Sequence, residues 1–170
     1  MKKMALFLTV LLSSAAAQAA DYFLPHTECD GSANVRVAPD TRSKIMMVLN
    51  YESKKHKILR KQGKWFHIQL DGIRTGYVHQ SQGFIVHNYV VASPDGSANV
   101  RNNSYPEEPI KQGEIIKTLP NGTRVQIVPA FRKGDWLWYS NQGAYTEKNE
   151  DGNNVSIQGY IHKSQLKRID

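Results

Sequence analysis

Short apolar or alternating segments recur along the chain, and turn residues separate them. In the first half these segments are 45–49, 56–59 and 65–70. In the second half they are 115–119, 124–128 and 136–139. Turn sequences such as Asp71-Gly72 and Pro120-Asn121-Gly122 lie between them. Segments of this length with such boundaries are typical of β-strands, and no window beyond the first twenty residues has the period of an amphipathic helix. We therefore predict an all-β fold.

Three blocks of sequence occur twice, in the same order. The heptapeptide Asp-Gly-Ser-Ala-Asn-Val-Arg stands at 30–36 and again, letter for letter, at 95–101. The other two blocks are Gly-x-Trp, at 63–65 and 134–136, and Gly-Tyr-[Val/Ile]-His-x-Ser-Gln, at 76–82 and 159–165. Repeats in the same order indicate two copies of one structural unit. Each copy must then bury a core of its own.

The length of each copy favours a closed sheet. About five strands in a unit of roughly 60 residues predict a small β-barrel, since closure removes the exposed edges of so short a sheet. The segment 84–93 between the copies is too apolar for a flexible linker. We expect this segment to form an added strand or a packed connector, so that the two barrels keep a fixed relation to each other.

The first nineteen residues have the three-part pattern of a secretory signal. Lys2 and Lys3 precede an apolar run at 4–12, and small residues follow as far as Ala19. This pattern predicts cleavage after Ala19. The apolar run is shorter than the roughly 20 residues that a membrane span requires, and the residues before Cys29 do not match a lipid-attachment pattern. We predict an exported protein, of the bacterial periplasm or cell wall, that does not span the membrane.

The chain is basic, with 22 Lys and Arg, 15 Asp and Glu, and a net charge of +7. Because Lys2 and Lys3 lie in the predicted signal, 20 basic residues remain against the 15 acidic ones. Such a surplus favours anionic partners. Outside the cytoplasm these are wall polymers, phospholipid head groups or an acidic protein rather than nucleic acid. The alternative is a solvated basic surface that has no partner.

The order of the repeated motifs resembles the bacterial SH3 domain family, twice over. Asn-Val-Arg, a loop containing Ala38-Pro39, an Ile/Leu strand, the Gly-x-Trp strand and the closing Gly-Tyr-[Val/Ile]-His block follow one another as in that family. The resemblance implies two tandem small SH3-like β-barrels after an N-terminal signal peptide. The first barrel spans 28–83, the connector 84–93, and the second barrel, with enlarged loops, 94–170. Family resemblance further implies binding or targeting modules, frequently for cell-wall material, without chemistry of their own.

The sequence shows no catalytic set, metal site or cofactor motif. The single cysteine, Cys29, lies between Glu28 and Asp30, whose charges raise a thiol pKa and oppose nucleophilic activation. His79 and His162 recur in the closing blocks, which predicts a structural role, and the other histidines lack the spacing of metal ligands. We therefore expect no enzyme. An unpaired exported thiol should either be buried or link two chains through a disulfide.

Two loops are longer in the second copy than in the first. The loop after Asn-Val-Arg has gained five residues and contains Tyr105. The loop after the Gly-x-Trp strand has gained twelve residues and contains Tyr145. Long loops on a rigid scaffold frequently carry binding. Neutral drift is the alternative, because surface insertions cost little stability.

Alternation adds a second clue in the same copy. It sends Leu137 and Tyr139 inward, which leaves Trp136 and Trp138 together on the outer face. Aromatic rings bring large contact areas with little rotamer entropy. The candidate ligand-binding residues are Trp136, Trp138, Tyr105 and Tyr145, with Arg132 and Lys133 steering anionic partners. The alternative is that the long loop or the other barrel covers one or both tryptophan rings.

These features predict an exported, non-catalytic binding module. Its partner would be cell-wall glycan or peptide, or an envelope protein. The alternative is an inhibitor or immunity protein that blocks an envelope-attacking enzyme, with the enlarged loops entering the cleft of the target. A secreted enzyme is the third class, and the missing catalytic residues argue against it.

Overall fold

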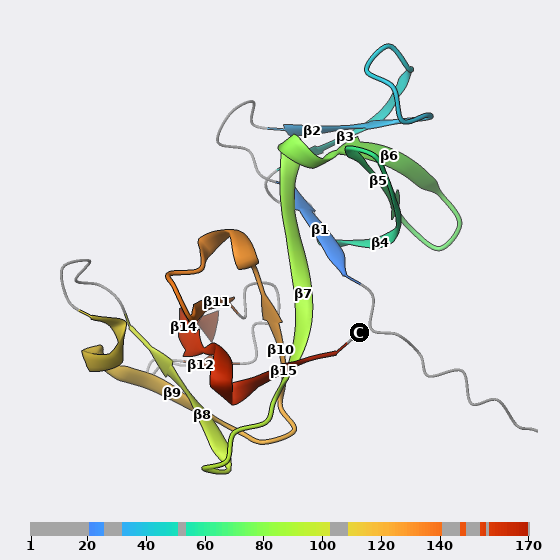
Figure 1. Ribbon diagram of the computed structural model, residues 1–170. Helices are drawn as coiled ribbons and strands as arrows, with labels where there is room; N and C mark the ends of the chain where they lie inside the picture. The colour runs from blue at the N-terminus through green and yellow to red at the C-terminus, as the bar shows by residue number, and fades with distance from the viewer. Residues whose placement is uncertain are drawn as a thin grey trace, which may run out of the picture.

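The computed structural model describes residues 21–25, 32–50, 54–102, 109–140, 147–148, 154–155 and 157–169. Within these ranges the regular structure consists of strands and short 3-10 helices, so the predicted all-β fold is confirmed. Figure 1 shows two small barrels, one built from each half of the chain. The predicted signal peptide at 1–19 and the thiol of Cys29 lie outside the described residues.

The main strands follow one another in the same order in the two halves, and the second half has additional short elements between them. The first half contains β1 (Tyr22–Pro25), β2 (Ser32–Arg36), β3 (Ile45–Asn50), β4 (His56–Gln62), β5 (Trp65–Gln69), β6 (Thr75–His79) and the 3-10 helix η1 (Gln80–Gln82). A long strand, β7 (Gly83–Val91), follows. The second half contains β8 (Ser97–Arg101), η2 (Ile110–Gln112), β9 (Ile115–Pro120), β10 (Arg124–Ile127), η3 (Pro129–Phe131), β11 (Trp136–Ser140), β12 (Glu147–Lys148), β13 (Asn154–Val155), β14 (Gln158–His162), η4 (Lys163–Gln165) and β15 (Leu166–Arg168).

Strand β7 belongs to both barrels. Its first residues pair with β1, with Gly83 opposite Pro25. Its last residues pair with β10 on one side and with β15 on the other. The strand order therefore runs without a break from β3 through β7 to β9. Figure 1 shows β7 as the long strand that leaves the upper barrel and enters the lower one. The segment predicted as a connector is thus largely strand, and β7 closes one barrel and opens the next.

Each barrel has a core of its own. The core of the first barrel consists of Phe23, Ala33, Val35, Leu49, Phe66, Ile68 and Val78. The core of the second consists of Val91, Ala98, Val100, Leu119, Val125, Ile127, Tyr139 and Ile161. Alternation supplies these residues: β2 and β8 have the same pattern of buried and half-buried positions. Burial of aliphatic and aromatic side chains is the main source of stability for such small barrels.

The repeated motifs hold equivalent turns in place. Arg36 donates to the Ser43 carbonyl (2.5 Å), and its counterpart Arg101 donates to the Gly113 carbonyl (2.8 Å), so each arginine closes the loop after its own strand. His79 caps η1, where its Nδ1 accepts from the Ser81 N–H. His162 caps η4 in the same way. The structural role expected for the two histidines is confirmed.

Side-chain contacts also join the barrels across β7. Asp21, just before β1, forms an ion pair with Arg168 of β15. Lys55 of the first barrel donates to the Gln126 side chain of β10. Phe84 meets Phe131 edge to face, with 4.6 Å between ring centroids. Together with the shared strand, these contacts hold the barrels in one arrangement.

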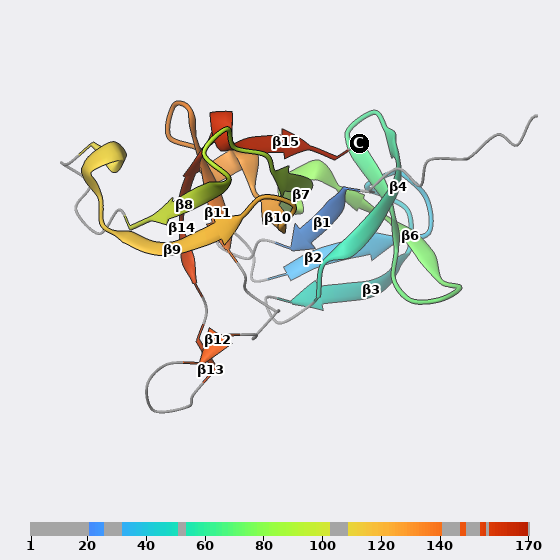
Figure 2. The same cartoon turned by 90° about the horizontal axis from the view of Figure 1, so that it is seen from below.

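Part of the enlarged loop between β11 and β14 forms a small hairpin. Strands β12 and β13 pair with each other in a separate two-stranded sheet. Figure 2 shows this hairpin standing away from the two barrels. The described part of the insertion therefore extends the molecule outward.

Candidate binding face on the second barrel

Two aromatic pairs cover the outer face of β11 and β14. The register of these strands sets Trp136 opposite His162 and Trp138 opposite Tyr160. Each pair meets edge to face, with ring centroids 5.0 Å apart. Such tilted geometry is the favourable one for neighbouring rings. We call Trp136, Trp138, Tyr160 and His162 the aromatic face.

The alternation expected for β11 is confirmed. Tyr139 is buried in the core of the second barrel, and Leu137 packs against that core. Trp136 and Trp138 are both half-buried and point to the opposite side. Neither ring is fully covered by the described residues, so both have surface left for a ligand.

A basic turn borders the aromatic face. Gly134 has a φ of +57°, a conformation that glycine adopts without strain, and it allows a tight two-residue turn between Lys133 and Trp136. The turn places the Lys133 ammonium 5.5 Å from the centroid of the Tyr160 ring. A cation at this distance from an aromatic ring is attracted by its π-electrons. Lys133 thus belongs to the face, whereas Arg132 is an exposed residue beside it.

Burial and charge set the state of the groups here. Burial raises the pKa of Tyr160, so its hydroxyl stays neutral at physiological pH. The hydrogen bond from Lys163 lowers the pKa of Asp135 and keeps its carboxylate ionised. That carboxylate is engaged by Lys163 at 2.8 Å. The face therefore combines two indole rings and the neutral phenol of Tyr160 with the ammonium group of Lys133.

The first barrel has an equivalent face of different character. Trp65 meets His79 edge to face at 5.1 Å, as Trp136 meets His162. At the next position His67, instead of tryptophan, stacks on Tyr77 at 4.6 Å. Arg60 donates to the Tyr77 hydroxyl (2.8 Å). Burial and the nearby Arg60 lower the pKa of His67. The face of the first barrel is more polar, and its side chains form hydrogen bonds and ring contacts with one another. The face of the second barrel is therefore the more apolar of the two surfaces.

The structure brings together some of the predicted site residues. Trp136, Trp138 and Lys133 lie on one face. Tyr105 and Tyr145 lie outside the described residues. Sequence reasoning missed Tyr160 as a partner of Trp138, because the long insertion between their strands hides the register in which the strands pair. The repeated Gly-Tyr block was the available signal.

The described residues contain no group of three or more His, Cys, Asp and Glu side chains that could hold a metal ion. In the same part of the chain, no helix is long and apolar enough to cross a membrane.

Comparisons with known proteins identify the first barrel. Residues 31–84 match the model of the bacterial SH3 domain family. No curated protein matches the sequence. NlpC1 from Trichomonas vaginalis is similar in structure over 95% of this chain and 50% of its own, with a TM-score of 0.38 and 18% identity. For NlpC2 from Trichomonas vaginalis these values are 88%, 48%, 0.37 and 14%. The present chain thus spans about half the length of either protein. Two tandem small barrels are present, and residues 31–84 form a bacterial SH3 domain.

Proposed function

We propose that this chain is an exported, non-catalytic binding module of the bacterial cell envelope. Bacterial SH3 domains are typically cell-wall binding modules of envelope proteins, and residues 31–84 form such a domain. The signal pattern of residues 1–19 supports export to the periplasm. The second barrel is a diverged copy of the same domain. Its identical heptapeptide and its equivalent strand pairing support this assignment.

The observation that carries the proposal is the aromatic face. Half-buried Trp136 and Trp138 present ring surfaces beside one another, and Lys133 adds a cation at the border. Indole rings contact the apolar faces of sugars, and an ammonium group attracts the carboxylates of wall peptides. This combination suits cell-wall glycan and its attached peptide as the ligand.

Retention of the mature protein on purified peptidoglycan tests the proposal. Trp138→Ala should weaken binding by about 2 kcal/mol or more, roughly thirtyfold, because aromatic hot spots lose this much on truncation. The matched control is His67→Ala, at the equivalent position of the first barrel, which should bind nearly as well as the unaltered protein. Thermal unfolding checks that both variants fold. Normal binding by a folded Trp138→Ala variant would exclude the aromatic face as the wall site.

A second candidate function is inhibition of an envelope-attacking enzyme. The β12–β13 hairpin, which stands away from the barrels, is the feature that favours it, because a projecting loop can enter the cleft of a target (Figure 2). Affinity capture from an envelope extract distinguishes the two functions. An inhibitor would retain one protein in a stable stoichiometric complex and would not bind purified peptidoglycan.

A further inference from the structure

The two ends of the sheet path are edge strands. Among the described strands, β3 pairs with β2 alone, and β9 pairs with β8 alone. The outer edge of such a strand offers backbone donors and acceptors to any further strand. Proteins usually block these edges with charged side chains, proline or bulges. The two edges of this molecule can be compared position by position, because they are copies of one element.

Strand β9 carries blocking residues that β3 does not have. Opposite Val100 lies Lys117, and opposite Ser97, at the end of the strand, lies Pro120. In the same register β3 has Met47 and Asn50. Lysine and proline are the residues that natural sheets use to prevent further pairing. The edge strand of the second barrel is therefore protected against further pairing, whereas β3 lacks these residues and has no second strand beside it in the described part of the chain.

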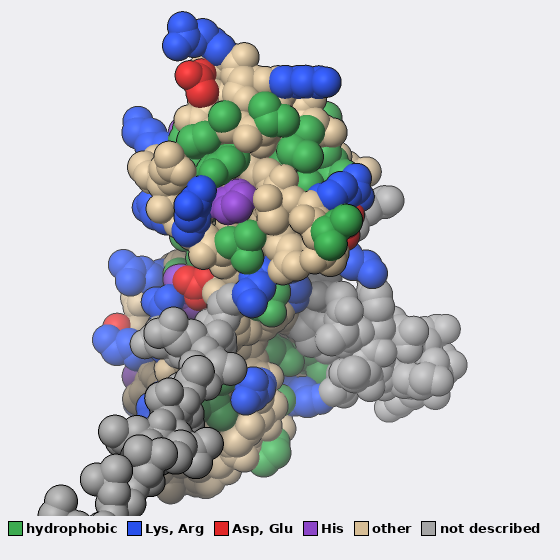
Figure 3. All heavy atoms as spheres, turned by 90° about the vertical axis from the view of Figure 1, so that its right-hand side faces the viewer, with side chains coloured by type: hydrophobic (Ala, Val, Ile, Leu, Met, Phe, Trp, Pro, Cys, Tyr) green, Lys and Arg blue, Asp and Glu red, His purple; other side chains and the backbone are tan. Residues whose placement is uncertain are grey.

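Both edges begin with two exposed apolar side chains: Ile45 and Met46 of β3 are 43% and 40% exposed, and Ile115 and Ile116 of β9 are 45% and 37% exposed. Only the β3 edge continues with exposed apolar side chains, since Val48 is 56% exposed and Val37 beside the strand is 54% exposed. At the position of Val48, β9 has Thr118, whose hydroxyl donates to the Asn99 side chain. Figure 3 shows hydrophobic side chains gathered over the first barrel, in the upper half of the view, with Lys and Arg side chains among them. Contiguous exposed apolar side chains mark interaction surfaces.

The charge around this edge indicates the kind of partner. The residues that lead into β3 include two cations, Arg42 and Lys44. Arg42 pairs with Asp40, and Lys44, directly before β3, is exposed. A second copy of this chain would bring the same positive charge to the edge, so pairing of β3 with itself is opposed by repulsion. An acidic segment is attracted instead.

We propose that the outer edge of β3 binds an extended, acidic segment of a partner protein as an added strand. Backbone hydrogen bonds to β3 supply affinity, apolar side chains of the partner contact Met46 and Val48, and its carboxylates meet Lys44. This site lies on the first barrel and is separate from the aromatic face of the second. It goes beyond wall binding, because it gives the chain a protein partner as well.

A synthetic peptide of five Glu-Val repeats, labelled with fluorescein, is the probe for this edge. We expect the mature protein to bind it at low salt and to release it as salt increases. Val48→Glu should weaken binding at least tenfold, because it sets a like charge within the added pair. The matched control is Thr118→Glu, the same change at the equivalent position of β9, which should leave binding unchanged. Neither side chain is in a core, so both variants should fold.

Amide hydrogen exchange distinguishes strand addition from diffuse charge attraction. Bound peptide should protect amides of β3 and leave those of β9 unaffected. Equal loss of binding in both variants, or no protection in β3, would overturn the proposal. Concentration-dependent dimers with protection in β3 and no peptide binding would show a second copy as the occupant. Trp138→Ala should bind the peptide normally, so failure at this edge is separable from failure of the wall-binding proposal.

Discussion

Asp21 and Arg168, 147 positions apart in the chain, form an ion pair of 3.1 Å between the start of the first barrel and the last strand of the second. The other oxygen of the Asp21 carboxylate accepts from Nδ1 of His87, in the middle of β7, at 2.6 Å. One carboxylate thus joins the first described strand, the shared strand and the last strand. These polar contacts join the two barrels in addition to the apolar contact between Phe84 and Phe131.

Replacing Asp21 should loosen the junction. We expect Asp21→Ala to lower the free energy of unfolding by about 1 to 2 kcal/mol. The substitution removes a half-buried carboxylate, so that Arg168 loses its ion pair and the His87 N–H loses its acceptor. Urea unfolding followed by tryptophan fluorescence measures the change. The matched control is Asp40→Ala, which breaks the exposed pair with Arg42 and should shift stability by less than about 0.5 kcal/mol. An equal loss of stability in the two variants would show that the contacts of Asp21 do not stabilise the junction between the barrels.

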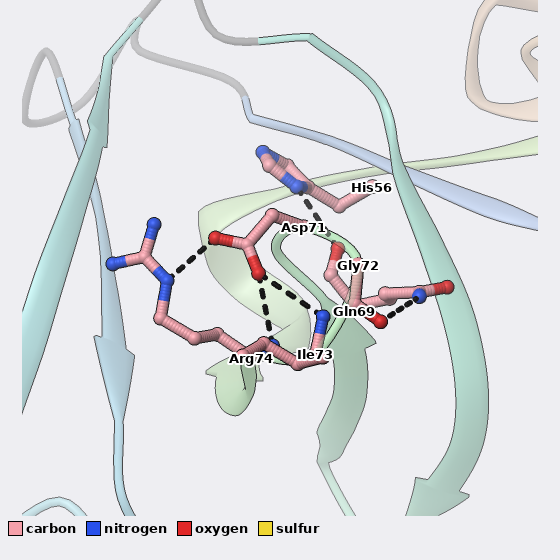
Figure 4. A network of polar contacts seen from close by, with 6 residues as sticks. All are labelled: His56, Gln69, Asp71, Gly72, Ile73 and Arg74. Carbon is pink, nitrogen blue, oxygen red and sulfur yellow. Dashed lines mark hydrogen bonds and ion pairs between the residues drawn. The ribbon is translucent and has the colours of Figure 1, made fainter.

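Stability should fall in mild acid because of His56. The Nδ1–H of this residue donates to the Gln69 carbonyl (3.1 Å), and its Nε2 is buried without a hydrogen-bond partner among the described residues (Figure 4). Burial lowers the pKa of His56 below its ordinary value of 6.5. As the pH falls below about 6.5, His56 is therefore protonated in the unfolded chain while it stays neutral in the folded protein. The free energy of unfolding should decrease from about pH 6.5 down to the folded-state pKa and then level off.

Unfolding of a His56→Gln variant between pH 7.5 and 5 checks this origin. The variant should lose most of the pH dependence in that range. His67→Gln should remove a smaller part, because the pKa of His67 is lowered too but its ring is less buried. A slope that persists in the double variant would assign the acid sensitivity to other groups.

Glycine in the closing block is required by a close approach of strands. A Cβ at Gly159 would lie 2.6 Å from the Arg101 carbonyl oxygen and 2.8 Å from a methyl group of Val100. Gly159→Ala should therefore destabilise the second barrel by about 1 to 3 kcal/mol through overpacking. The control is Gly72→Ala, where a Cβ would meet nothing within 4 Å. Thermal unfolding of the two variants should differ clearly, and a stable Gly159→Ala protein would show that β8 and β14 can separate at little cost.

Local sequence signals were sufficient for the strands and for the face of each side chain. The period of two placed Tyr139 inside and Trp138 outside, and the core of the second barrel bears this out. The strand expected at 56–59 extends to Gln62 as β4, since its exposed basic residues keep no apolar alternation to reveal it. Such local patterns indicate which side of a strand is buried, and they do so independently of which strand lies beside it.

Pairing between distant strands could not be predicted in this way. β1 spans only Tyr22–Pro25 and lies ahead of the predicted range 28–83, yet it pairs with both β4 and β7. The double membership of β7 was likewise hidden, because an apolar strand gives no sign of changing partners along its length. The meeting of Trp138 and Tyr160 depends on the register across a long insertion. These relations arise from closure of the whole barrel rather than from any local pattern.

Because β7 is a continuous strand, no hinge separates the barrel that bears the β3 edge from the barrel that bears the aromatic face. The distance between the two surfaces is therefore set by the chain itself. A ligand assembly that carries an acidic peptide and a glycan at the matching spacing would gain avidity, since the first contact raises the effective concentration of the second. An assembly with any other spacing would bind through one surface alone. We therefore expect the shared strand to make the spacing between the two proposed ligands, and not only their chemistry, a condition for tight binding.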